Sequence, residues 1–190
     1  KVFDALPKLK LVVTFSTGYD HINLKEAKKR GITVCNVPAY GTETVAEHAL
    51  TLMLALAKNL FPAVSRVKGG TFDYHGLRGF DLTGKTVGIV GAGKIGRRLV
   101  HLLTPFDVDV LVYDHHKDPE FEEDYGVEYV SKTKLFERSD IISLHLPLFP
   151  ETKHMINRTA IKKMKKVVHI INTARGGLIH SKALVWGLAT

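Results

Sequence analysis

Gly91, Gly93 and Gly96, in the stretch "VGIVGAGKIGRRL", have the GxGxxG spacing of loops that bind a dinucleotide. The loop follows an apolar run typical of a buried strand and opens a helical pattern. In that context Gly91 permits a tight turn, Gly93 leaves room for a pyrophosphate, and Gly96 lets helix and strand pack closely. The helix N-terminus would offer its free amides to the anion. The alternative is a glycine turn that binds no ligand.

Asp114 ends the next predicted strand, 18 positions after Gly96. A carboxylate near this spacing accepts hydrogen bonds from an adenosine ribose and would repel the 2′-phosphate of NADP. The sequence therefore favours NAD over NADP. His115, His116 and Lys117 follow directly and would soften that repulsion. The alternative is that Asp114 only begins a turn.

Arg175 lies in "IINTARGGLI", between an apolar β-branched run and two glycines. The run predicts a buried strand, so a guanidinium stands where that strand ends. In open α/β sheets the carboxyl ends of the strands are where ligands bind. The alternative is an arginine in a structural salt bridge.

The elements that would position these residues alternate between strand and helix, which predicts βαβ units and parallel sheets. The second series of strands lacks apolar and polar alternation, which predicts a sheet covered on both faces, as in doubly wound α/β folds. A long helix begins at Thr42, and Pro62 is expected to end or kink it. The strands are predicted at residues 9–16, 32–37, 85–90, 109–114, 127–130, 140–147 and 167–173, and the other helices at 23–30, 94–103, 134–139, 157–164 and 181–188.

The composition is that of a globular protein, with 45% hydrophobic and 24% charged residues and a net charge of +8. The basic residues are scattered and lack interleaved aromatics, which favours a solvated face over nucleic-acid binding. An anionic cofactor or substrate would account for part of the excess. Cys35 is the single cysteine, which excludes an internal disulfide and the usual zinc sites, and its place in "ITVCNV" favours a buried residue.

No apolar stretch reaches about 18 residues without a charge or proline, so no transmembrane helix is predicted. The first residues lack the order of a secretory signal, and a cytoplasmic protein is the expectation. Residues 71–84 are rich in glycine and polar residues without a sustained period, which predicts a linker there.

Over nearly its whole length the chain resembles the D-isomer-specific 2-hydroxyacid dehydrogenases. The resemblance lies in "STGYDHINL", "GITVCNVPAYGTETVAEHAL", "LTGKTVGIVGAGKIGRRL", "SDIISLHLPLFPETKHMIN" and "INTARGGLI", which follow the family's order. The first two look most like the D-lactate dehydrogenase branch. The resemblance implies an α/β fold with a doubly wound, Rossmann-type parallel sheet at residues 85–190, incomplete at its C-terminal end. Part of a flavodoxin-like substrate domain, including the long helix, would precede it at residues 1–70.

The resemblance also implies an NAD-dependent oxidoreductase that transfers a hydride between NAD(H) and a small D-2-hydroxy acid or 2-keto acid, with D-lactate and pyruvate as the first expected pair. Arg175 matches the catalytic arginine, whose planar fork would hold the substrate carboxylate and C2 oxygen and polarise the carbonyl. Ser16, Thr17 and Gly18 match a loop whose amides receive the substrate carboxylate, which would put the substrate between two domains.

The cofactor positions implied by the family are Gly91, Gly93, Lys94, Ile95, Gly96, Asp114, Leu146, Pro147, Thr152, Thr173, Ala174 and Arg175, and no metal is expected. Plain core packing is the alternative for Leu146, Pro147 and Ala174. Relatives carry a catalytic glutamate and histidine beyond the arginine, in stretches resembling "GLDVFE" and "TPH". Neither stretch is present, so we expect a central piece of a longer enzyme. The histidines considered as substitutes, and expected to be structural, are His48, His145, His154, His169 and His180.

Two other functions remain open on the sequence alone. The first is an NAD-sensing, corepressor-like interaction protein, and the second is a fragment that binds the cofactor without turnover. We expect a homodimer, because relatives dimerise through the region of "ALTLMLALAKNLF", although core packing explains that apolar stripe almost as well. No membrane or nucleic-acid partner is expected.

Overall fold

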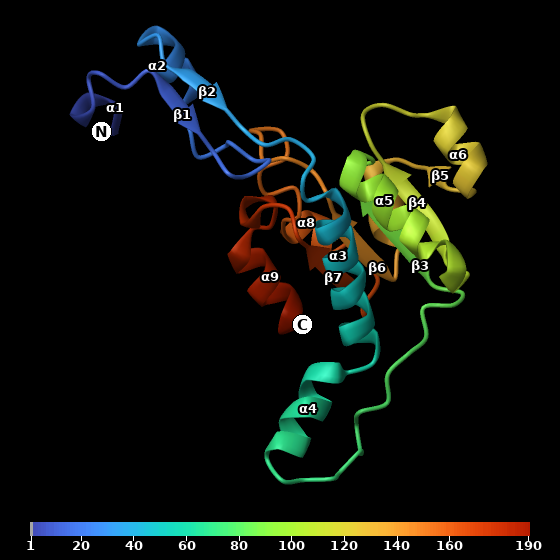
Figure 1. The fold of residues 1–190 in the computed structure, drawn as a ribbon. Coiled ribbons are helices and arrows are strands. Elements are labelled where there is room, and N and C mark those ends of the chain that lie inside the picture. Colours follow the sequence, from blue (N-terminus) through green and yellow to red (C-terminus); the bar gives the residue numbers. More distant parts are fainter. Residues whose placement is uncertain (1) are drawn as a thin grey trace. The chain divides into compact units, whose positions relative to one another are not determined.

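The computed structural model describes residues 2–190, which form two compact units divided between Thr42 and Glu43. The division falls at the start of helix α3 (Thr42–Ala57; Figure 1), so this helix belongs to the second unit. The sequence expectation grouped it with the first domain and put the crossing at residues 71–84, a segment that contains no helix or strand. The grouping differs because Ala46, Ala49 and Met53 of α3 are buried in the core of the second unit.

The first unit is a βαβ arrangement in which two short strands pair in parallel, with Leu11 opposite Thr33 and Val13 opposite Cys35. Cys35 is exposed, so the expectation that it is buried was wrong. The reason is that the strands form a sheet of only two, whose outer positions are left open. The elements of this unit are α1 (Val2–Ala5), β1 (Leu11–Val13), α2 (Leu24–Lys29) and β2 (Thr33–Cys35).

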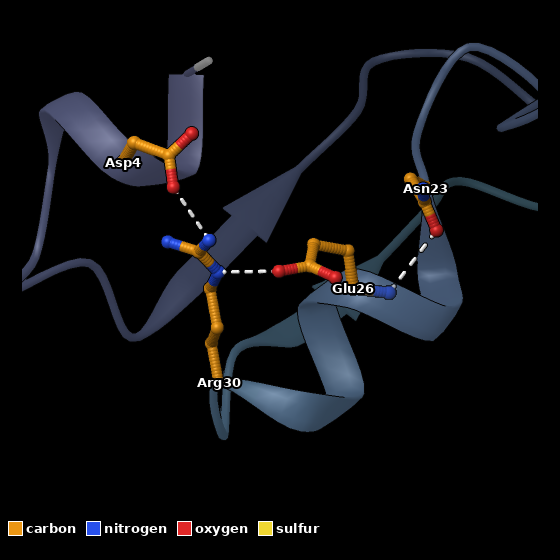
Figure 2. A network of polar contacts seen from close by, with 4 residues as sticks. All are labelled: Asp4, Asn23, Glu26 and Arg30. Carbon is orange, nitrogen blue, oxygen red and sulfur yellow. Dashed lines mark hydrogen bonds and ion pairs between the residues drawn. The ribbon is translucent and has the colours of Figure 1, made fainter.

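Arg30, directly after α2, joins this helix to the N-terminal segment (Figure 2). Its Nη2 donates to Asp4 Oδ1 at 2.5 Å and its Nε to Glu26 Oε1 at 2.9 Å. The hydrogen bond from Arg30 lowers the pKa of Asp4. Asn23 Oδ1 caps α2 by accepting from the Glu26 N–H at 3.0 Å. Because these groups are exposed to solvent, they fix local geometry more than they stabilise the fold.

The second unit is built on a parallel sheet of five strands in the order β5-β4-β3-β6-β7. Val90 pairs with both Tyr113 and Leu144, and Leu144 pairs with Asn172, so four strands end at the same edge. The winding reverses between β3 and β6, and such a switch point is where open α/β sheets bind ligands. The strands are β3 (Thr86–Val90), β4 (Asp109–Tyr113), β5 (Glu128–Tyr129), β6 (Ile141–Leu144) and β7 (His169–Asn172).

Helices cover both faces of this sheet, which confirms the doubly wound expectation (Figure 1). Val87 and Ile89 of β3 belong to one buried cluster with residues of α3 and α5, whereas Val90 belongs to a second cluster with residues of α7 and α8. The remaining helical elements are α4 (Leu60–Lys68), α5 (Lys94–Leu103), η1 (Thr104–Phe106), α6 (Pro119–Tyr125), α7 (Lys132–Arg138), α8 (Arg158–Ile161), η2 (Gly176–Leu178) and α9 (Ser181–Leu188).

The long predicted helix is broken as expected, but at Asn59 rather than at Pro62. Asn59 adopts a left-handed conformation with φ of 49°, and α4 bends away from α3 by 67°. Pro62 lies in the first turn of α4, where its missing N–H removes no helical hydrogen bond. Between residues 2 and 190 no single helix is long and apolar enough to cross a membrane, and α3 and α4 meet that criterion only as this bent pair.

Helix α5 begins against the end of β3 at a distance that only glycine permits. A Cβ atom on Gly96 would lie 2.1 Å from the carbonyl oxygen of Gly91, and Gly91 itself has a φ of 101°. At Gly93, by contrast, no described atom lies within 4 Å of the Cβ position. Gly96 is therefore required by packing, whereas the fold leaves space free at Gly93.

We predict that Gly96→Ala lowers the free energy of unfolding by about 1–3 kcal/mol or more, because the carbonyl oxygen of Gly91 cannot move away from the new methyl group. Gly93→Ser is the matched control, since its Cβ has space and serine is favourable at the N-cap position that Gly93 occupies. Urea denaturation followed by circular dichroism measures both. Equal midpoints for the two variants would contradict this account of the close approach.

Candidate functional site

Asp114 lies directly after β4 and contacts the glycine loop that follows β3. Its Oδ2 accepts a hydrogen bond from the Ala92 N–H at 2.7 Å, and its Oδ1 accepts from the His116 N–H at 3.0 Å. The structure thus brings together the two features that the sequence linked by spacing. The second bond also shows that Asp114 begins a turn, as the alternative interpretation expected.

The N-terminus of α5 opens beside this contact. Its N-cap residue is Gly93, which has no side chain to cap the helix, so the amides of the first turn keep their donors available. Gly93 and Lys94 are exposed, whereas Ile95 packs against the core. An anion at this position would meet backbone N–H groups, the positive end of the helix dipole and the Lys94 ammonium group.

The loop after β6 borders the glycine loop through Leu146. A Cβ atom on Gly91 would lie 2.8 Å from Leu146 Cδ2, which shows how closely the two segments approach. Thr152, which is buried, holds this loop closed: its Oγ1 donates to the Pro147 carbonyl at 2.7 Å and accepts from the Phe149 N–H at 2.8 Å. The Thr152 hydroxyl therefore has an evident structural task in shaping the loop.

His145 starts the same loop, and burial lowers its pKa to about 4. Its Nε2 lies 2.9 Å from Ser143 Oγ, which supplies a hydrogen-bonding partner for the half-buried ring. The imidazole is neutral near neutral pH, so it is a poor candidate for a proton donor.

The turn after β7 presents Arg175 and is held by Asn172. Asn172 Oδ1 accepts from the Ala174 N–H at 3.1 Å, and its Nδ2 donates to the Arg175 carbonyl at 2.9 Å. The Arg175 side chain is half-buried, and its Nη1 donates to the Ala174 carbonyl at 2.9 Å. Sequence reasoning missed Asn172, although an asparagine at the end of a strand is a known signal for such side-chain turns.

Thr173 in this turn has a buried polar atom. Its Oγ1 has no hydrogen-bond partner among residues 2–190. Buried hydroxyl groups are normally paired, so this one favours a ligand that would supply the partner. The two backbone groups of Ala174, in contrast, are already engaged inside the turn.

The loops after β6 and β7 are joined by backbone hydrogen bonds. The His154 N–H donates to the Gly177 carbonyl at 2.8 Å, and the Ile156 N–H donates to the Leu178 carbonyl at 3.0 Å. Together with the contact between Leu146 and the glycine loop, these bonds place the predicted cofactor positions of the second unit along one edge of the sheet.

The loop of Ser16, Thr17 and Gly18 lies in the first unit, after β1. Ser16 Oγ donates to the Gly18 carbonyl at 2.8 Å. Asn36 Nδ2 donates to the Thr17 carbonyl at 2.8 Å, which ties this loop to the segment after β2. The three residues therefore form a defined loop at the carboxyl end of a parallel strand.

The other histidines that the sequence drew attention to lie in structural settings. His180 Nδ1 accepts from the Ala183 N–H at 3.2 Å and caps α9, and its ring meets that of His154 edge to face at 4.8 Å. His169 packs against Phe80 with 5.0 Å between ring centroids. His48 is exposed on α3.

Comparison with known proteins agrees with a dinucleotide-binding fold for the second unit. Residues 50–190 match the family described as D-isomer specific 2-hydroxyacid dehydrogenase, NAD binding domain. A glyoxylate reductase of Korarchaeum cryptofilum is 42% identical over 188 residues, covering 97% of this chain and 57% of the relative. A D-lactate dehydrogenase of Escherichia coli is 41% identical, covering 95% of this chain and 54% of the relative.

A solved structure of D-lactate dehydrogenase from Aquifex aeolicus, complexed with NAD and lactic acid, is similar in fold. It aligns with a TM-score of 0.91 and 40% sequence identity, covering 99% of this chain and 56% of that one. The chain thus spans little more than half the length of the relatives it matches. Because the family match covers most of the chain and includes the whole parallel sheet, the chain belongs to the D-isomer-specific 2-hydroxyacid dehydrogenases.

Proposed function

We propose that the protein is an NAD-dependent oxidoreductase that transfers a hydride between NAD(H) and a small D-2-hydroxy acid or 2-keto acid. The observation that supports it most is the shared edge: the glycine loop, Asp114 and the Arg175 turn all follow strands that end together. A coenzyme and its substrate need such neighbouring positions to react. The proposal includes a cytoplasmic location.

The residues of this edge fit NAD(H). The open space at Gly93 and the uncapped start of α5 suit the pyrophosphate, and the Asp114 carboxylate suits the ribose hydroxyls. Leu146 and Pro147 offer an apolar border for the adenosine, and the Thr173 hydroxyl offers an unpaired group on the nicotinamide side. NAD(H) would supply the hydride donor or acceptor.

Arg175 is the residue we assign to the substrate. A guanidinium binds a carboxylate and an adjacent carbonyl oxygen with two parallel donors, and it stabilises negative charge that grows on that oxygen. Ser16, Thr17 and Gly18 are assigned to the substrate carboxylate through their backbone amides. The relatives named above act on lactate or glyoxylate, which are both small acids of this class, so the substrate proposed first is D-lactate with pyruvate.

The competing functions are an NAD-sensing interaction protein and a cofactor-binding chain without turnover. Arg175 and the Ser16–Gly18 loop favour the enzyme, because a sensor of NAD alone needs neither. Incubation with NADH and pyruvate, or with NADH and glyoxylate, separates the possibilities. Oxidation of NADH by either acid supports the enzyme, whereas tight NADH binding without oxidation supports the others.

A homodimer through the region of residues 49–61, extended along α4, is also part of the proposal. The inner residues of α3 are buried in the core, whereas Phe61 and Val67 of α4 are 62% and 65% exposed. Exposed apolar side chains of this size favour burial against a partner. Sedimentation analysis tests the assignment: a dimer that Phe61→Glu dissociates supports it, and a monomeric wild-type protein contradicts it.

For Arg175 we predict that replacement by alanine lowers kcat by a factor of about 100 or more and leaves NADH affinity nearly unchanged, because the guanidinium acts on the substrate. Arg175→Lys should also be slow, since one ammonium group cannot replace the fork. Arg138→Ala, which removes an exposed pair with Glu128, is the control. Equal losses of turnover and NADH affinity in Arg175→Ala would refute the assigned role.

For Asp114 we predict that replacement by asparagine or alanine weakens NADH relative to NADPH, because the carboxylate no longer repels the 2′-phosphate. Asn keeps an oxygen for the Ala92 N–H, so it separates the charge from the loop contact. Fluorescence titration with both cofactors gives the ratio of dissociation constants. An unchanged ratio in both variants would show that another residue determines the preference.

A further inference from the structure

Ala92, the middle residue of the glycine loop, has both of its backbone groups held by charged side chains. Its N–H donates to Asp114 Oδ2 at 2.7 Å, and its carbonyl accepts from Arg97 Nε at 2.9 Å. The sequence drew attention to Asp114 but gave no role to Arg97. An arginine one turn into α5 thus reaches back to the loop that precedes its own helix.

The Arg97 guanidinium is itself fixed by α6. Its Nη1 lies 2.6 Å from Asp118 Oδ2, and its Cζ lies 4.5 Å from the centroid of the Phe121 ring, which is buried. Asp118 Oδ1 accepts from the Phe121 N–H and so caps α6. The hydrogen bond from Arg97 lowers the pKa of Asp118, so the pair stays ionised near neutral pH. These contacts hold the guanidinium in one position.

The held carbonyl determines where a neighbouring donor points. The peptide bond between Ala92 and Gly93 is trans, because the described chain has no cis bonds. In a trans peptide the C=O and the following N–H point in opposite directions. Arg97 therefore turns the Gly93 N–H away from itself, and Gly93 is the exposed residue at the start of α5.

We propose that Arg97, held by Asp118, is a positioning residue that orients the Ala92–Gly93 peptide so that the Gly93 N–H is ready to bind the pyrophosphate of NAD(H). Arg97 acts through the backbone and does not contact the cofactor. The inference rests on the proposed function, since it needs NAD(H) to bind at the glycine loop.

Arg97→Lys and Arg98→Lys form the first test. Both keep the positive charge, but a lysine at position 97 cannot bridge Ala92 and Asp118 as the guanidinium does. Arg98, the next residue of α5, pairs instead with Glu43 of α3. NADH titration should show about tenfold weaker binding for Arg97→Lys and less than about a twofold change for Arg98→Lys.

Asp118→Asn provides a second test, in which electrostatics alone and the positioning role predict opposite changes in NADH affinity. Asparagine keeps a capping oxygen for α6 but removes a negative charge, so electrostatics alone would strengthen the binding of an anionic cofactor. The positioning role predicts weaker NADH binding instead, because Arg97 loses its ionised partner. Tighter binding in this variant would overturn the inference.

The ligand-free protein gives a second readout. Hydrogen exchange of the amides of residues 91–95 should be faster in Arg97→Lys than in wild type, whereas the far-ultraviolet circular dichroism should be the same. If wild type binds NADH and Arg97→Lys has the same NADH affinity and the same amide exchange rates, the inference about Arg97 fails while the proposed function stands. If wild type does not bind NADH, the proposed function fails and the inference fails with it.

Discussion

The contact between the start of α5 and the end of β3 is the constraint on which the second unit depends. Gly96 brings the helix against the carbonyl of Gly91 with no space for a side chain, and this fixes where the first turn of α5 begins. Because the helix starts there, its free amides lie at the carboxyl end of the central strand, at the switch point between β3 and β6. The same geometry that packs the helix therefore forms the position proposed to bind the pyrophosphate.

Most polar side chains at this edge bind backbone rather than each other. Asp114 and Arg97 hold the glycine loop, Thr152 closes the loop after β6, and Asn172 shapes the turn that presents Arg175. Such side chains fix the direction of peptide groups before a ligand arrives, which lowers the ordering cost of binding. The positive charges of Lys94 and Arg175 at this edge also explain part of the basic composition, since both the proposed cofactor and the proposed substrate are anions.

The sequence predicted the parts of the fold that depend on local pattern. The five strands of the parallel sheet and helix α5 formed where apolar runs and glycines placed them. Helix α6 was missed because its sequence, PEFEEDY, is mostly acidic and has no apolar period, although Asp118 followed by Pro119 is a helix-start signal. The break at Asn59 and the exposure of Cys35 depend on packing between distant segments, and so do the contacts of Arg97 with Asp118 and with Phe121 of α6. No pattern of neighbouring residues contains that information.

The measurement that tests the central claim most directly is an NMR titration of the amide signals with NADH. If the carboxyl edge binds the cofactor, the signals of residues 91–96 and of Asp114, Leu146 and Thr173 should shift together and saturate with one dissociation constant. Signals of α4, which lies away from this edge in Figure 1, should stay in place. Saturable shifts confined to other residues, or no saturation at all, would contradict the account.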